Sequence, residues 1–73
     1  MSRALTVEEI ARAIQCSEQR ARNYLREVDP RIEVYLEKPT ELVERQIVIE
    51  LCRIYEGRLV GRRLLRLLGE TQI

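Results

Sequence analysis

The chain has no histidine, tryptophan or phenylalanine, and its 73 residues include only two cysteines. Without histidine, and with its two cysteines far apart, the sequence lacks the usual zinc ligand pattern, so we expect no metal and no cofactor. No apolar run approaches the roughly 18 residues that a membrane span requires. Cys16 and Cys52 are interpreted as reduced thiols, and we expect a cytoplasmic protein with no membrane contact.

Catalytic residue patterns are scarce as well. The only serines are Ser2 and Ser17, and the sequence shows no plausible pair of a nucleophile with a general base, since it has no histidine. Gly57 and Gly61 lack the strand, glycine-rich turn and lysine that make a phosphate loop. We therefore expect that the chain is not an enzyme.

Charge is distributed in blocks, although the net charge is only +1. Residues 1–26 and 57–73 are basic, whereas residues 27–56 are acidic. All the basic residues except Lys38 are arginines, the type favoured for bidentate contacts to phosphate and guanine. A compositional bias of the genome would produce the same excess.

Two helices are predicted in the first part of the chain. Thr6 is a good N-cap for a helix from Val7 to about Ile14, and Ser17 caps a second helix from Glu18 to about Val28. The second helix is polar except for one narrow apolar stripe. The residue before Pro30 avoids helical geometry, which ends this helix.

The segment 6–26 carries the strongest motif. Ala11 supplies the small residue where two helices can cross, and apolar residues occupy the positions that lock the turn, namely Ile10, Ile14, Cys16, Ala21, Tyr24 and Leu25. The spacing, with the string Glu9-Ile10-Ala11, Ile14, Cys16-Ser17 and Tyr24-Leu25, resembles the helix-turn-helix of prokaryotic transcription regulators. Gln15 stands where that family usually has glycine, so it must adopt a left-handed conformation.

The resemblance implies that the second helix enters the major groove of duplex DNA. The residues expected to read bases are Ser17, Glu18, Gln19, Arg22 and Asn23. The residues expected to meet phosphates are Arg12, Arg20, Arg26, Arg62 and Arg66. The alternative for each arginine is a solvated helix face, and Glu18 can instead serve the helix dipole.

The second part of the chain predicts one strand and two helices. Residues 31–37 alternate between apolar and polar, as in a half-buried strand. Thr40 is expected to cap a helix from Glu41 to about Tyr55, and a last helix should run from Leu59 to Leu68 and end at Gly69. On the last helix Arg58, Arg62 and Arg66 form a basic stripe. Together with Arg63, these arginines are candidates for a second phosphate-binding surface.

A chain this short has a marginal core of its own, because it buries only about 60% of its unfolded surface. The apolar stripe of the predicted helix 41–55 is unusually wide, and the predicted strand has no partner in the chain. Both features favour a homodimer. Its interface is expected to contain Ile32, Val34, Leu36, Ile47, Val48, Leu51, Ile54 and Tyr55.

Residues 31–69 carry a weaker resemblance. The segments Ile32-Glu33-Val34-Tyr35-Leu36, Thr40-Glu41-Leu42, Tyr55-Glu56-Gly57-Arg58-Leu59 and Arg66-Leu67-Leu68-Gly69 resemble small antitoxin-like prokaryotic proteins whose opening is similar to ribbon-helix-helix dimers. This resemblance implies pairing through the strand and the long helix. Glu33 and Glu37 on the outer strand face would repel a DNA backbone, so we assign the strand to dimerisation or to a wing.

The sequence thus predicts a mainly α single domain, residues 1–73, with a helix-turn-helix in 1–29 and a dimerisation part in 30–73. The expected function is duplex DNA binding as a small homodimeric transcription regulator. The alternative is an antitoxin-like interaction module whose apolar helix 41–55 binds a toxin-like partner protein. The two differ in salt dependence, which is steep for phosphate contacts and weak for an apolar interface.

Overall fold

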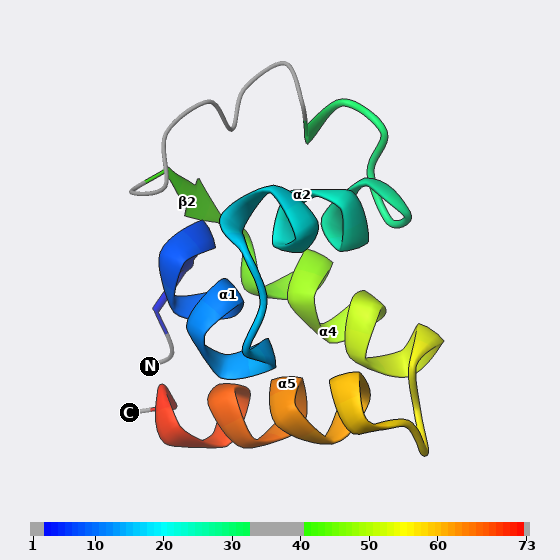
Figure 1. Cartoon of the computed structure of the whole chain (residues 1–73). Coiled ribbons are helices and arrows are strands. Elements are labelled where there is room, and N and C mark those ends of the chain that lie inside the picture. Colours follow the sequence, from blue (N-terminus) through cyan, green and yellow to red (C-terminus); the bar gives the residue numbers. More distant parts are fainter. Residues whose placement is uncertain (1–2, 33–40, 73) are drawn as a thin grey trace.

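The computed structural model describes residues 3–32 and 41–72 (Figure 1). Its elements, in chain order, are β1 (Leu5–Thr6), α1 (Val7–Ile14), α2 (Glu18–Arg26), β2 (Leu42–Val43), α4 (Arg45–Ile54) and α5 (Leu59–Glu70). Helix α1 packs against α2 on one side and α5 on the other, and α4 contacts the same two helices. The mainly α fold class is confirmed for the described residues.

Helix α1 begins and ends as the sequence predicts. The Thr6 hydroxyl accepts from the Glu9 amide at 3.1 Å, and the Glu9 carboxylate accepts from the Thr6 amide at 3.1 Å, which completes a capping box. At the other end Gln15 is left-handed, with φ 64° and ψ 52°, and the Cys16 amide donates to the Ala11 carbonyl at 3.0 Å. This conformation costs a non-glycine residue about 1 kcal/mol.

Helix α2 has the simple cap that was predicted, because the Ser17 hydroxyl accepts from the Arg20 amide at 3.1 Å. The helix ends at Arg26, two residues earlier than expected. The Val28 amide then donates to the Leu25 carbonyl at 3.0 Å, so the last turn tightens before Pro30. The α2 side chains buried in the core are Ala21 and Leu25.

The second part of the chain corrects the prediction in three places. Arg31 lies in a turn and Ile32 is helical, so the predicted strand is absent at both, and its residues 33–37 fall outside the described part. The predicted helix start was also wrong, because Leu42–Val43 is a strand and α4 begins at Arg45; Thr40, the expected cap, is outside the described residues. Helix α5 continues through Gly69 to Glu70.

The strand pairing among the described residues is between β1 and β2. They are antiparallel, with Leu5 opposite Val43 and Thr6 opposite Leu42. Leu5 and Val43 are both buried. The pairing therefore holds the segment before α1 against the segment before α4. Because Leu42 and Val43 take part in this long-range contact, they are extended and do not belong to the helix that local periodicity predicted.

Much of the predicted dimer interface is instead core of the single chain. Ile32, Val48 and Leu51 have 0% of their surface exposed. The reason is that α4 contacts both α2 and α5, so one chain covers most of its wide apolar stripe. Ile47 and Tyr55 are half-buried and pack against this core, whereas Ile54 is 55% exposed. Val34 and Leu36 lie outside the described residues.

The contact between α4 and α5 is close at Gly61. A Cβ atom at this position would lie 2.1 Å from the Tyr55 carbonyl oxygen, so a side chain does not fit. The Cys52 thiol donates to the Gly61 carbonyl at 3.3 Å across the same contact. None of the helices in the described ranges is long and apolar enough to cross a membrane.

Candidate nucleic-acid interface

The face of α2 that points away from the core carries four of the predicted DNA contacts. Because Ala21 and Leu25 are buried, residues spaced by three and four on the opposite side face outward. These residues are Gln19, Arg22, Asn23 and Arg26. The Gln19 amide donates to Asn23 Oδ1 at 3.2 Å, and the Arg26 guanidinium donates to the same oxygen at 2.5 Å. The fold thus brings these predicted residues together as one polar row.

The other predicted residues of α2 lie at its beginning and along its flank. Ser17 forms the N-cap through its hydroxyl, and Glu18 is half-buried in the first turn, where an acid suits the helix dipole. Both positions therefore have a structural role. Arg20 is exposed and lines a shallow hollow together with Asn23, Tyr24, Glu27 and Tyr55, so it borders the polar row at Asn23.

A cluster that the sequence reasoning missed holds the end of α2 against α4. The rings of Tyr24 and Tyr55 meet edge to face, with centroids 5.2 Å apart and planes at 88°. The Tyr55 hydroxyl donates to the Glu27 carboxylate at 2.6 Å, and this hydrogen bond raises the pKa of Tyr55 to about 12. No local signal pairs these residues, because they come from segments far apart in the chain.

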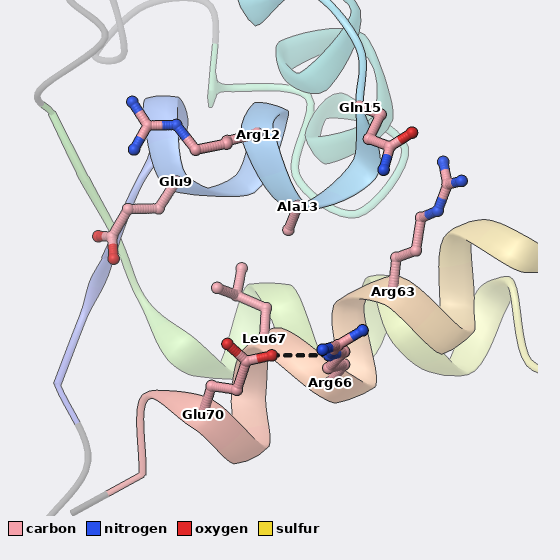
Figure 2. A pocket seen from close by; sticks show the side chains of 8 residues that line it. All are labelled: Glu9, Arg12, Ala13, Gln15, Arg63, Arg66, Leu67 and Glu70. Carbon is pink, nitrogen blue, oxygen red and sulfur yellow. Dashed lines mark hydrogen bonds and ion pairs between the residues drawn. The ribbon is translucent and has the colours of Figure 1, made fainter.

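Two of the predicted phosphate contacts line a hollow between α1 and α5, with a volume of about 390 Å³ (Figure 2). Its lining residues are Glu9, Arg12, Ala13, Gln15, Arg63, Arg66, Leu67 and Glu70. Arg12 forms an ion pair with Glu8 at 3.0 Å, and Arg66 forms one with Glu70 at 2.8 Å. Both pairs are exposed, and such pairs stabilise a protein by at most about 1 kcal/mol, so a phosphate group can displace them.

Arg63 ties this hollow to the turn before α2. Its guanidinium donates to the Ile14 carbonyl at 2.8 Å, at the C-terminal end of α1, where the helix dipole favours a cation. Gln15 follows directly and lines the same hollow. Figure 2 shows Gln15 and Arg63 at one end of the hollow and Glu9 at the other.

Glu9 is fixed by several partners at once. Arg3 donates to its carboxylate at 2.8 Å, and the Thr6 amide and hydroxyl donate to it as well. The hydrogen bond from Arg3, followed by the amide of Thr6, lowers the pKa of Glu9 to about 2 against the opposing effect of burial. Its charge is therefore already compensated within the chain.

Arg62 does not share the hollow with Arg66. It lines a separate groove between α4 and α5, where the apolar lining comes from Ile49, Cys52, Leu65 and Leu68. Leu65 is 64% exposed there. The two arginines that the sequence grouped as one basic stripe therefore border different surfaces.

No family model matches the chain, and neither a curated protein nor a solved structure matches it. The function must therefore be inferred from the residues and their geometry.

Proposed function

We propose that this protein binds duplex DNA through the outward face of α2. The observation that carries the proposal is the row of Gln19, Arg22, Asn23 and Arg26 on a helix whose opposite side is fixed in the core. Within this row Gln19 and Arg26 both donate hydrogen bonds to Asn23. Guanidinium groups fork onto guanine, and side-chain amides pair with adenine. The row therefore offers both chemistries that read base edges in the major groove.

The size and support of α2 suit this role. An α-helix with its side chains is about 10 to 12 Å in diameter, so the major groove, about 12 Å wide, admits it, and the nine residues of α2 extend for roughly 13 Å along the helix axis. The helix follows a tight turn at Gln15, and its far end is held by the contact of Tyr24 with Tyr55. A reading helix benefits from such support, because a fixed helix loses little freedom on binding.

As a regulator the protein would act as a homodimer, with one α2 in each of two successive major grooves. The apolar side chains available to a second copy are those that the single chain leaves exposed on α4 and α5. They are Ile54, Leu59 and Leu65. This surface replaces the buried residues Ile32, Val48 and Leu51 in the proposed interface.

The second candidate function is a protein-interaction module, as in the antitoxin-like alternative. The observation that favours it is the groove between α4 and α5, with its exposed Leu65 and a rim that carries both charge signs through Arg53, Glu56 and Arg62. Under this alternative α2 is scaffold, and the groove binds a toxin-like partner.

An NMR titration of the isotope-labelled protein with a short mixed-sequence duplex separates the two functions. We expect amide shifts concentrated on residues 15–26, with few in the groove between α4 and α5. Shifts confined to that groove, or none at all, would refute DNA binding by α2.

A further inference from the structure

The conformation of Gln15 is the first sign of an additional site. The turn between α1 and α2 needs a left-handed residue, a position that glycine fills without strain, yet a glutamine occupies it. The Gln15 backbone is thus strained, and its side chain is exposed at the edge of the hollow between α1 and α5. Strain of this kind concentrates at functional sites, where the side chain is needed.

The neighbours of Gln15 are suited to an oxyanion. Arg63 has five N–H donors, and the Ile14 carbonyl is the acceptor for one of its nitrogens. Arg66, one helical turn further along α5, lines the same hollow, and its exposed pair with Glu70 is weak. The hollow therefore offers three guanidinium groups, from Arg12, Arg63 and Arg66, and the Gln15 amide over a floor of Ala13 and Leu67 (Figure 2). Its two carboxylates, Glu9 and Glu70, are each paired with an arginine.

We infer that Gln15, Arg63 and Arg66 form a phosphate-binding site, and that its ligand is the DNA backbone beside the beginning of α2. The inference rests on the proposed function. Gln15 lines the hollow and lies two residues before the cap Ser17, so a phosphate bound beside Gln15 would be close to the beginning of α2. Helix α5 thereby becomes a second DNA-binding element that fixes the register of α2 without reading sequence.

The test measures the affinity for a mixed-sequence duplex at about 50 and about 200 mM salt. We expect Arg66→Gln to weaken binding and to reduce the slope of log K against log salt by about one. The matched control is Arg62→Gln, an exposed arginine of the same helix that lines the other groove, and its slope should stay that of the wild type. Glu70→Gln releases Arg66 and should strengthen binding.

Gln15→Gly adds a readout that a structural role would not give. Relief of the left-handed strain should raise the Tm, whereas loss of the amide should weaken DNA binding about threefold to tenfold with an unchanged salt slope. A variant that is more stable and binds DNA as well as the wild type would overturn the inference. Equal slope changes in Arg66→Gln and Arg62→Gln would overturn it too.

Inorganic phosphate distinguishes the two possible sources of the ligand. The Tm of the wild type and of Arg66→Gln is measured in phosphate and in chloride at equal ionic strength. Suppose that phosphate raises the Tm of the wild type alone, while both proteins bind duplex DNA with the same slope of log K against log salt. The site then takes a free anion, and the assignment to the DNA backbone is overturned. If the wild type binds no duplex, the proposed function fails, and this thermal shift alone decides whether a phosphate site exists.

Discussion

The Tyr55 hydroxyl donates a 2.6 Å hydrogen bond to the Glu27 carboxylate and so joins the C-terminal ends of α4 and α2. Tyr55→Phe keeps the ring contact with Tyr24 but removes this bond, and we expect a loss of about 1 kcal/mol in the free energy of unfolding. Urea denaturation measures the loss. Tyr24→Phe, which retains the Tyr55 hydroxyl and its bond, is the control.

The same bond predicts a pH dependence at the alkaline end. The pKa of Tyr55 is raised from 10 to about 12 in the folded protein, first by the hydrogen bond to Glu27. The folded state therefore binds this proton more tightly than the unfolded state, so the contribution is complete below pH 10 and is lost as the pH rises toward 12. Ultraviolet titration of the wild type should show a tyrosine ionisation toward pH 12 that is absent from Tyr55→Phe; if the ionisation removed by this substitution lies near pH 10, the assignment is refuted.

Glu9 predicts a loss of stability at the acidic end. Its pKa falls from 4.5 to about 2, chiefly through the hydrogen bond from Arg3. A lowered pKa means that the stabilisation is complete above pH 4.5 and disappears as the pH falls toward 2. Thermal unfolding of Glu9→Gln should depend less on pH in this window than that of the wild type. Arg3→Gln should shift the loss to higher pH, and unchanged profiles in both variants would argue against the assignment.

Replacing Gly61 or Gly69 of α5 by alanine should change the free energy of unfolding by different amounts. Gly61→Ala would place a Cβ 2.1 Å from the Tyr55 carbonyl, so α4 and α5 must separate, at a cost of about 1 to 3 kcal/mol or more. Gly69→Ala meets nothing within 4 Å and should be neutral or stabilise the helix by up to about 1 kcal/mol. Denaturation of the two variants measures the difference; equal effects would mean that the helices are less closely packed than described.

Arg63 is expected to stabilise the fold independently of any DNA binding. Arg63→Gln loses the charged hydrogen bond to the Ile14 carbonyl, and we expect a destabilisation of about 1 to 2 kcal/mol. Arg62→Gln, which removes the neighbouring charge without a comparable bond, should change the stability by less than about 0.5 kcal/mol. A similar stability for both variants would show that the link between α1 and α5 contributes little.

Local signals allowed much of the first part of the fold to be predicted. Caps at Thr6 and Ser17 and the left-handed Gln15 follow from side-chain chemistry within a few residues, so the two helix beginnings and the turn were predicted correctly. The outward row of α2 follows from the same helical periodicity.

Long-range contacts explain what the sequence did not predict. The pairing of Leu5 with Val43 joins segments that local periodicity treats separately, and it moves the start of α4 to Arg45. The burial of Val48 and Leu51 depends on α2 and α5 covering α4 from two sides. The separation of Arg62 from Arg66 likewise depends on which helix packs beside each part of α5.

The most direct test of DNA binding by α2 is the affinity for a mixed-sequence duplex at two salt concentrations, measured for the wild type and for Arg22→Ala with Arg26→Ala. The control pair is Arg53→Ala with Arg58→Ala, which removes equal charge from exposed positions outside α2. We predict binding that weakens steeply with salt and is lost only in the first pair. Absent binding, or binding to which both pairs respond alike, would contradict the account and favour the protein-partner function of the groove between α4 and α5.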